Sequence, residues 1–237
     1  MTISPHTAAE RKRVLILGAG GHGRVVLDIL SQACQHDVVG FLDNNSAIKG
    51  RRVDGVPVYG GIDELHALAS ELDVGGVLIA IGDNGTRCGL CRQVEAAGIE
   101  LMTAIHPSAT LARNATVGRN VVIAAGSVVC AHCQIGDSVI LNTGCIIDHQ
   151  TMIGEGCHIC PGVRVAGRVK VESGAFVGIG ATVIPNVTLG CECIVGAGSV
   201  VTEDVPPLAT VLGVPARPVK TASATEDVAA MLLPARP

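Results

Sequence analysis

The sequence predicts a chain of two unlike parts, an α/β domain over residues 13–103 and an all-β solenoid over residues 104–204. Two observations support this division. Apolar runs alternate with helix-like stretches in the first part, and a strict six-residue repeat fills the second. A leader over residues 1–12 precedes them, and an extension over 205–220 and a tail over 221–237 follow. The sequence leaves the order of the tail open.

The composition predicts a folded chain with an unusual core. Of its 237 residues, 48% are hydrophobic and 16% are charged, which excludes a chain that is disordered throughout. The chain has two Phe, one Tyr, no Trp and 30 Gly. Because so few large side chains cannot fill a thick core, we expect small aliphatic residues packed in thin layers.

Charge and hydropathy exclude several classes of protein. The formal net charge is −4 and no stretch interleaves arginines with aromatic residues, so nucleic-acid binding is not expected. No apolar run reaches the roughly 18 residues that a transmembrane helix needs, so no membrane insertion is expected. Residues 1–13 lack the apolar core of a signal peptide. We therefore expect a cytoplasmic protein whose ten cysteines are thiols.

Three apolar runs alternate with three helix-like stretches in the first part, which predicts a small parallel sheet with helices between its strands. The first run is expected to lead directly into the first helix. The apolar runs are Val14–Leu17, Val38–Leu42 and Val77–Ile81, and the helix-like stretches are Gly23–Ala33, Ile62–Glu71 and Gly85–Ala97.

The turn after the first apolar run is rich in glycine. Residues 18–23 read Gly-Ala-Gly-Gly-His-Gly, which completes the pattern G-x-G-x-x-G, and Asp43 follows the next run, twenty residues after Gly23. This is the fingerprint of a Rossmann-like dinucleotide site, in which backbone amides at a helix N-terminus bind a diphosphate. No second mononucleotide-binding half follows, so NAD binding is kept only as an alternative.

Residues 109–204 divide into sixteen consecutive hexads without one insertion. The third position of every hexad is aliphatic, and a small or β-branched residue often stands two positions earlier. Because alternate residues of a strand point to the same side, both positions are predicted to face inward. Glycines directly after the aliphatic residue are expected to adopt a positive φ at the corners. These glycines are Gly118, Gly136, Gly154, Gly178, Gly190 and Gly196.

Together with the ending Gly-Val-Pro-Ala-Arg at 213–217, the repeat resembles the left-handed parallel β-helix of hexapeptide-repeat acyltransferases. In that family three hexads form one coil of a three-sided prism. Sorted by this rule, two faces are largely apolar and one is polar. Exposed apolar faces commonly mark interfaces, and the family packs its prisms as trimers, so the resemblance implies a homotrimer. The first face carries Val122, Ile140, His158, Phe176 and Ile194, the second Val128, Ile146, Arg164, Thr182 and Val200, and the third Thr116, Gln134, Met152, Lys170 and Thr188.

Three pairs of cysteines have the C-x-x-C spacing of a zinc site, at 88–91, 130–133 and 157–160. The hexad register accounts for the second and third pairs, because it places one cysteine of each pair inside the prism and the other at a corner. Inward thiols stacked along a prism do not converge on one ion. No metal is therefore expected.

The span from about residue 13 to 220 resembles the NeuD/PglD-type family of sugar acetyltransferases. In that family the glycine turn binds a nucleotide-sugar acceptor instead of NAD, and acetyl-CoA is the co-substrate. For Asp43 a turn or helix-capping role is the alternative to substrate binding. The substrate contacts that the resemblance implies are Gly20, Gly21, His22, Asp43, Asn44 and Gly82.

Residues 146–155 read Ile-Ile-Asp-His-Gln-Thr-Met-Ile-Gly-Glu and closely resemble the family segment with the catalytic histidine. The resemblance implies that His149 is the general base and that His158 and Gly167 contact acetyl-CoA. Well-studied N-acetyltransferases of the family have Glu directly after that histidine, where it raises the basicity of the ring. This chain has Gln150, which carries no charge, so Asp148 on the other flank is a second candidate to orient the ring.

These observations predict an acetyl-CoA-dependent N-acetyltransferase that acts on a nucleotide-linked 4-amino sugar, with direct attack of the amine on the thioester. O-acetylation of a sialic-acid-type sugar is one alternative. A non-catalytic trimer that binds NAD or a sugar nucleotide is another. In the hexad register His149 and His158 lie half a coil apart, on different sides of a filled prism. We therefore expect them to meet only across the interface between two subunits.

Overall fold

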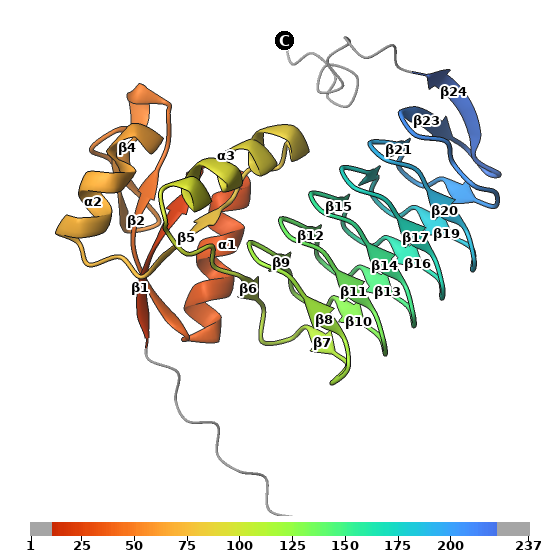
Figure 1. Ribbon diagram of the computed structural model, residues 1–237, viewed down its shortest axis with the longest axis horizontal. Coiled ribbons are helices and arrows are strands. Elements are labelled where there is room, and N and C mark those ends of the chain that lie inside the picture. The colour runs from red at the N-terminus through yellow and green to blue at the C-terminus, as the bar shows by residue number, and fades with distance from the viewer. Residues whose placement is uncertain (1–10, 222–237) are drawn as a thin grey trace, which may run out of the picture.

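The computed structural model describes residues 11–221, and its two parts lie side by side (Figure 1). The first part is a five-stranded sheet in the order β3-β4-β2-β1-β5. Only β3 and β4 pair antiparallel, so the predicted parallel sheet has one antiparallel edge strand. Its elements are β1 (Lys12–Leu17), α1 (Gly21–Ala33), β2 (His36–Leu42), η1 (Ser46–Ile48), β3 (Arg52–Val53), β4 (Val56–Gly60), η2 (Ile62–Glu64), α2 (Leu65–Glu71), β5 (Gly76–Ile79) and α3 (Asn84–Ala96). The predicted leader and tail lie almost wholly outside the described residues.

The second part is a three-faced parallel β-helix built from strands of two residues, which confirms the predicted fold class. The first face is the sheet formed by β6 (Ala104–Ile105), β9 (Val122–Ile123), β12 (Ile140–Leu141), β15 (His158–Ile159), β18 (Phe176–Val177), β21 (Ile194–Val195), β23 (Ala209–Leu212) and β24 (Arg217–Thr221). The second face is formed by β7 (Thr110–Leu111), β10 (Val128–Val129), β13 (Ile146–Ile147), β16 (Arg164–Val165), β19 (Thr182–Val183) and β22 (Val200–Val201). The third face is formed by β8 (Thr116–Val117), β11 (Gln134–Ile135), β14 (Met152–Ile153), β17 (Lys170–Val171) and β20 (Thr188–Leu189).

The inside of the β-helix has the predicted composition. From Ile123 onward the aliphatic residues at the third hexad positions, such as Ile147 and Ile159, are buried, and so are the residues two positions earlier, such as Cys145 and Thr151. Side chains of this size fill a narrow prism, because each layer needs only a few methyl and thiol groups to reach close packing. The scarcity of aromatic residues is therefore explained by the width of the prism.

The prediction that the six corner glycines adopt a positive φ is wrong. None of them has a positive φ, which is found instead at later corner positions such as Gly144 and Gly162, and at non-glycine residues such as Gln150. The six glycines lie where the next coil passes closely. A Cβ at Gly154 would lie 2.7 Å from the backbone nitrogen of Ser173, which is closer than real Cβ atoms approach.

The first face is covered by the chain's own α/β domain along part of its length (Figure 1). Val122 belongs to the same buried cluster as Val26 and Leu30 of α1, and Ile140 is 0% exposed within the single chain. The apolar character of these two outward positions is thus explained within one subunit and gives no support for an interface. Phe176 and Ile194 of this face remain partly exposed.

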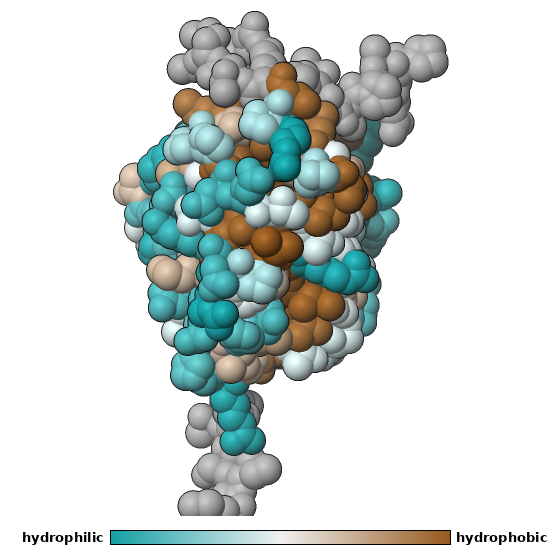
Figure 2. Space-filling view, turned by 90° about the vertical axis from the view of Figure 1, so that its right-hand side faces the viewer, coloured by the Kyte–Doolittle hydropathy of each residue, from teal (hydrophilic) through white to brown (hydrophobic). Residues whose placement is uncertain are grey.

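The end of the β-helix is closed by a hairpin. β23 joins the first face in parallel with β21, and β24 returns antiparallel to β23. Figure 2 shows this end of the molecule, where apolar patches lie between polar ones. The exposed apolar side chains of the hairpin region are Leu208, Leu212, Val214 and Val219.

The close approach of neighbouring coils predicts opposite effects for the same substitution at two glycines. Gly154→Ala should destabilise the protein by about 1–3 kcal/mol, because the new methyl group collides with a backbone that cannot move aside. Gly89→Ala is the matched control, since Gly89 lies within α3 with no atom within 4 Å of an added Cβ. It should stabilise the protein by about 0.5–1 kcal/mol. Urea unfolding measures both, and equal effects of the two substitutions would contradict the explanation.

Candidate functional site

The glycine turn connects β1 to α1, which begins at Gly21 with Gly20 as its N-cap. No side chain caps this end, so N–H groups of the first turn of α1 remain available to a ligand. Gly18 has a φ of 108°, and a Cβ at Gly23 would lie 1.9 Å from the carbonyl oxygen of Gly18. These two glycines close the turn. A Cβ at Gly20 or Gly21 would meet no atom within 4 Å, so the outer side of the turn is open.

Asp43 and Asn44 follow β2, and Asp43 supports the backbone of the glycine turn. One carboxylate oxygen of Asp43 accepts the N–H of Ala19 at 2.8 Å, and the other accepts the N–H of Asn45 at 2.8 Å. The side-chain oxygen of Asn44 accepts the N–H of Ile62 at 3.3 Å. In the chain by itself both side chains therefore accept hydrogen bonds from the backbone of nearby loops. For Asp43 this is the turn role that the sequence offers as the alternative to substrate binding.

The loop between β5 and α3 is fastened to the β-helix by Arg87, whose side chain is fully buried. Its guanidinium donates to main-chain carbonyls of both parts of the molecule and to one side-chain amide. The acceptors are Ile81 O (2.9 Å), Gly82 O (3.1 Å), Asn84 Oδ1 (2.9 Å), Ser138 O (2.8 Å), Gly156 O (2.9 Å) and Cys157 O (3.4 Å). All of them are uncharged, and within residues 11–221 no carboxylate forms an ion pair with Arg87.

His158 projects from the first face toward the same loop. Its Nδ1 lies 3.3 Å from the carbonyl oxygen of Gly82, and its Nε2 lies 3.4 Å from the side-chain amide nitrogen of Asn142. Because a carbonyl can only accept, Nδ1 carries the hydrogen. The ring meets Phe176 edge-on, with ring centroids 5.2 Å apart. Burial, and then the charge of Arg87, lower the pKa of His158 to about 4, so its ring is neutral at physiological pH.

His22 faces this cluster from the first turn of α1. Burial, followed by the charge of Arg87, lowers its pKa to about 4 as well, and the charge that each histidine would gain disfavours protonation of the other. The Nε2 atom of His22 is buried and finds no hydrogen-bond partner in the described part of the chain. A buried polar atom without a partner is costly, and such atoms often mark the place of a ligand or water.

His149 lies elsewhere, at the corner between β13 of the second face and β14 of the third. Its ring lies over Gly167 of the next coil, where a Cβ would approach the ring atoms to 2.5 Å. Its Nδ1 lies 3.3 Å from the side-chain oxygen of Gln150, whereas Asp148 accepts the backbone N–H of His149 at 2.7 Å. Gln150 therefore orients the ring, and Asp148 orients the backbone of the corner.

The sequence-predicted residues thus fall into two groups. The glycine turn, Gly82 and His158 gather where the α/β domain meets the first face. His149 with its neighbours lies at the corner opposite the first face, because that corner joins the other two faces. Sequence reasoning missed Arg87, and it placed Phe176 on the apolar first face without its contact with His158. Arg87 carries no sequence signal, since its partners are mostly main-chain carbonyls that any residue supplies.

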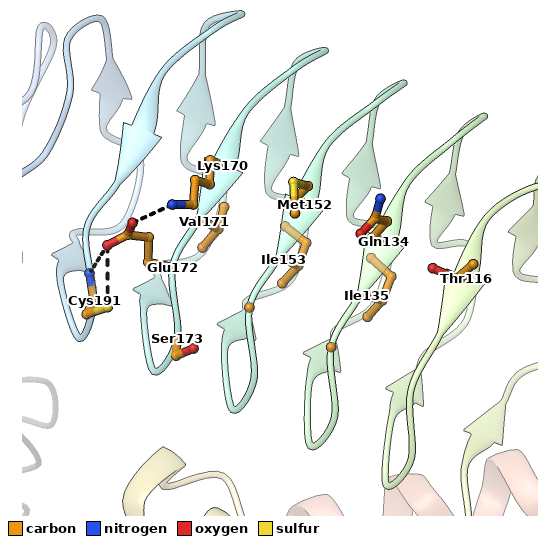
Figure 3. Close-up of a pocket in the computed structure, with 12 residues that line it drawn as sticks. Thr116, Gln134, Ile135, Met152, Ile153, Lys170, Val171, Glu172, Ser173 and Cys191 are labelled. Carbon is orange, nitrogen blue, oxygen red and sulfur yellow. Dashed lines mark hydrogen bonds and ion pairs between the residues drawn. The ribbon is translucent and has the colours of Figure 1, made fainter.

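A groove runs along the third face and reaches residues of the corner that follows this face, such as Ser173 and Cys191 (Figure 3). Its floor is formed by outward side chains of successive coils, including Gln134, Met152 and Lys170. Lys170 donates to Glu172 at 2.8 Å, and Glu172 also accepts the backbone N–H of Cys191 at 3.2 Å. The groove therefore combines a floor of mixed polar and apolar side chains with one charged end.

The cysteines of the β-helix behave as packing residues. Burial raises the pKa of Cys157 and Cys160 to about 12 and that of Cys145 to about 11, so these thiols stay protonated. Across residues 11–221 no three His, Cys, Asp or Glu side chains gather in a way that could hold a metal ion. Within the same residues no helix has the length and apolar composition to cross a membrane.

Comparison with known proteins shows similarity along most of the chain. The PglD N-terminal domain matches residues 13–94, and the bacterial transferase hexapeptide (six repeats) matches residues 132–167. UDP-N-acetylbacillosamine N-acetyltransferase of Bacillus subtilis (strain 168) is 34% identical over 115 residues, which cover 48% of this chain and 52% of that protein. The chain therefore matches about half the length of this curated relative.

Two solved structures are similar over nearly their whole length. A histidine mutant of perosamine N-acetyltransferase from Caulobacter crescentus, in complex with CoA and GDP-perosamine, has 40% identity and a TM-score of 0.83, and the match covers 87% of this chain and 96% of that one. The acetyltransferase domain of PglB from Neisseria gonorrhoeae FA1090 has 32% identity and a TM-score of 0.82, with 88% and 100% of the two chains covered.

The two buried histidines predict a loss of stability in mild acid. Their pKa is about 6.5 when unfolded and about 4 when folded, so between these values the unfolded state binds more protons. Stability should fall as the pH drops from about 6.5 to about 4, by up to about 3 kcal/mol for each histidine. Thermal unfolding at several pH values measures this dependence, and His158→Gln should reduce the loss of stability per pH unit. The control His66→Gln changes an exposed residue of α2 and should leave it unchanged. An unchanged slope in His158→Gln would contradict the assignment.

Proposed function

The chain belongs to the hexapeptide-repeat sugar N-acetyltransferases, and on this basis we propose that it transfers the acetyl group of acetyl-CoA to the amine of a nucleotide-linked 4-amino sugar. The observation that carries the proposal is the 40% identity to perosamine N-acetyltransferase over 96% of that protein's chain. The structure of that relative holds CoA and GDP-perosamine, and an acetyltransferase domain at 30% identity is in complex with acetyl coenzyme A.

The acceptor is bound by the glycine turn and the loop that follows β5. The uncapped N-terminus of α1 offers backbone N–H groups to the diphosphate, and the open outer side of Gly20 and Gly21 lets it approach. Asp43 and Asn44 stand at the rim of this turn, where each carboxylate or amide oxygen keeps a lone pair for a ribose or sugar hydroxyl. The unpartnered Nε2 of His22 supplies a further polar contact.

His149 is the general base. Because its Nδ1–H donates to Gln150, its Nε2 carries the lone pair that takes a proton. The amine nitrogen of the sugar attacks the thioester carbonyl carbon, so that a C–N bond forms and the C–S bond breaks. The proton lost by the amine passes to Nε2 of His149, and CoA leaves as a thiolate that is then protonated. Gln150 fixes the tautomer without adding the charge that a Glu would place beside the ring.

A complete site needs two subunits. Within one chain the glycine turn and His158 lie on the first face, and His149 lies at the opposite corner of a filled prism. The acetyl-CoA that contacts His158 and Gly167 therefore bridges two prisms, so that one subunit supplies His149 and its neighbour supplies His158. A homotrimer has three such clefts. The partly exposed Phe176 and Ile146 are available to the interface.

Acetyl-CoA turnover against a panel of nucleotide-linked amino sugars tests the proposed function. We expect CoA release with at least one 4-amino sugar, and the product should carry an amide. His149→Ala should lower kcat by about 10²–10⁴, with little change in the affinity for acetyl-CoA. Release with hydroxyl acceptors only would favour a sugar O-acetyltransferase. Tight binding of NADH without any turnover would favour the non-catalytic alternative.

Mixing two inactive variants tests whether the site is shared between subunits. His149→Ala and His158→Ala should each be impaired alone, and subunit exchange between them should restore part of the activity. A hybrid trimer pairs an intact His149 with an intact His158 across one interface. Mass spectrometry of intact hybrids confirms the exchange. If verified hybrids stay inactive, or if the native protein sediments as a monomer, the shared site is wrong.

A further inference from the structure

Arg87 is a charged group that the reaction does not use and that the fold holds out of water. Its side chain is 0% exposed, and its acceptors within the described residues are all uncharged. Burial lowers the pKa of the guanidinium, because the charged form loses its contact with water. A buried ion without a counter-ion is expensive compared with a well-packed apolar side chain. Its hydrogen bonds are therefore the feature of this residue that needs an explanation.

We propose that Arg87 is a positioning residue, which holds the carbonyl of Gly82 so that this oxygen keeps His158 in the Nδ1–H form and leaves its Nε2 as an acceptor for acetyl-CoA. The last clause rests on the proposed function, whereas the first two concern the chain alone. The carbonyl oxygen of Gly82 is the shared point, since it accepts from Arg87 at 3.1 Å and lies 3.3 Å from Nδ1 of His158.

The position of the guanidinium is determined by the β-helix. It donates to the carbonyls of Ser138 and Gly156, which lie at the same corner in successive coils, 18 residues apart. These carbonyls belong to a rigid stack of coils. The β-helix therefore holds the guanidinium in place, and the guanidinium in turn holds the loop after β5.

Packing does not hold Gly82 in place. The residue is exposed, and a Cβ added to it would meet no atom within 4 Å. Its carbonyl is thus oriented by hydrogen bonds, of which the charge-assisted bond from Arg87 is the stronger. Within residues 11–221 the carbonyl of Gly82 has no hydrogen-bonding partner other than Arg87 and His158.

The hydrogen on Nδ1 leaves Nε2 of His158 with a lone pair. Its present contact is the amide nitrogen of Asn142 at 3.4 Å, which is a long hydrogen bond. The group that Nε2 recognises is consequently an N–H donor. The pantetheine arm of acetyl-CoA carries two amide N–H groups, so it has the chemistry that this acceptor fits.

The tautomer of His158 can be measured directly by NMR, on protein labelled with ¹⁵N in its histidines. The two ring nitrogens have different chemical shifts when they carry a hydrogen, and His158→Gln identifies the signals of this ring. We expect the Nδ1–H form in the wild type and a mixture of the two forms in Arg87→Met. Arg87→Lys keeps the charge but loses the planar fork, and should lie between them. Arg92→Met changes an exposed arginine of the same helix and should resemble the wild type.

Kinetics separate positioning from stability. Arg87→Met should raise the KM for acetyl-CoA about tenfold and change kcat little, because a hydrogen bond from the pantetheine arm to His158 is lost while His149 is untouched. A purely structural role would lower the amount of active enzyme, and so kcat, with KM unchanged. Calorimetry with CoA gives the affinity without turnover, so these tests remain valid if no amino sugar is accepted.

Three results would overturn the proposal. An Nε2–H form of His158 in the wild type would do so without any variant, even if both Arg87 variants fail to fold. An unchanged tautomer in a folded Arg87→Met protein would also overturn it. So would an unchanged affinity for CoA in that variant.

Discussion

Each coil of the β-helix hydrogen-bonds to the coil 18 residues later, and this stacking determines where the other parts of the molecule lie. The N–H of Asp148 donates to Val165 at 2.9 Å, and the N–H of Arg168 donates to His149 at 2.9 Å. Because this register of 18 residues holds as far as β22, a residue's position in its hexad determines its face, its direction and its neighbour in the next coil. His149 lies over Gly167 for this reason, and a side chain at Gly167 would occupy the place of the ring.

The stacked coils also provide main-chain carbonyls at fixed positions, and the α/β domain is attached to them. Arg87 uses three of these carbonyls, and the side chain of Asn120 accepts the N–H of Ile79 at 2.7 Å from the opposite direction. Neither contact requires a particular side chain on the other part. The charge of Arg87 has a further effect, since it adds to burial in lowering the pKa of both His22 and His158. A structural attachment thus also contributes to the protonation state of the residues around it.

The sequence predicts some of these features well and others not at all. The hexad register identifies the inward residues and the face of each outward one, because it depends only on counting. It does not show what covers a face, so Ile140 and Ile146 look alike in the sequence, although one is buried under the α/β domain and the other is 37% exposed. A glycine at a corner can serve either to adopt a positive φ or to let another part of the chain approach closely, and the sequence does not distinguish the two. The structure shows that close approach is the reason for these corner glycines.

The corner of His149 shows the same limit. The resemblance points to His149, but the chain's departure at Gln150 left open which neighbour orients the ring. The side-chain directions answer this within the chain, since Gln150 reaches Nδ1 and Asp148 bonds to the backbone. Arg87 was not identified, because a buried arginine that binds carbonyls has no pattern in a single sequence.

The distribution of the thiols has a practical consequence for spectroscopy. Of the ten cysteines only Cys34 and Cys191 are exposed, and the others are buried or half-buried. Cys34 ends α1 in the α/β domain, and Cys191 lies at a corner of the β-helix just after β20. The unaltered chain therefore offers one accessible attachment point on each of its two parts. A donor and acceptor dye placed there would report changes in the distance between the parts without any cysteine being added or removed.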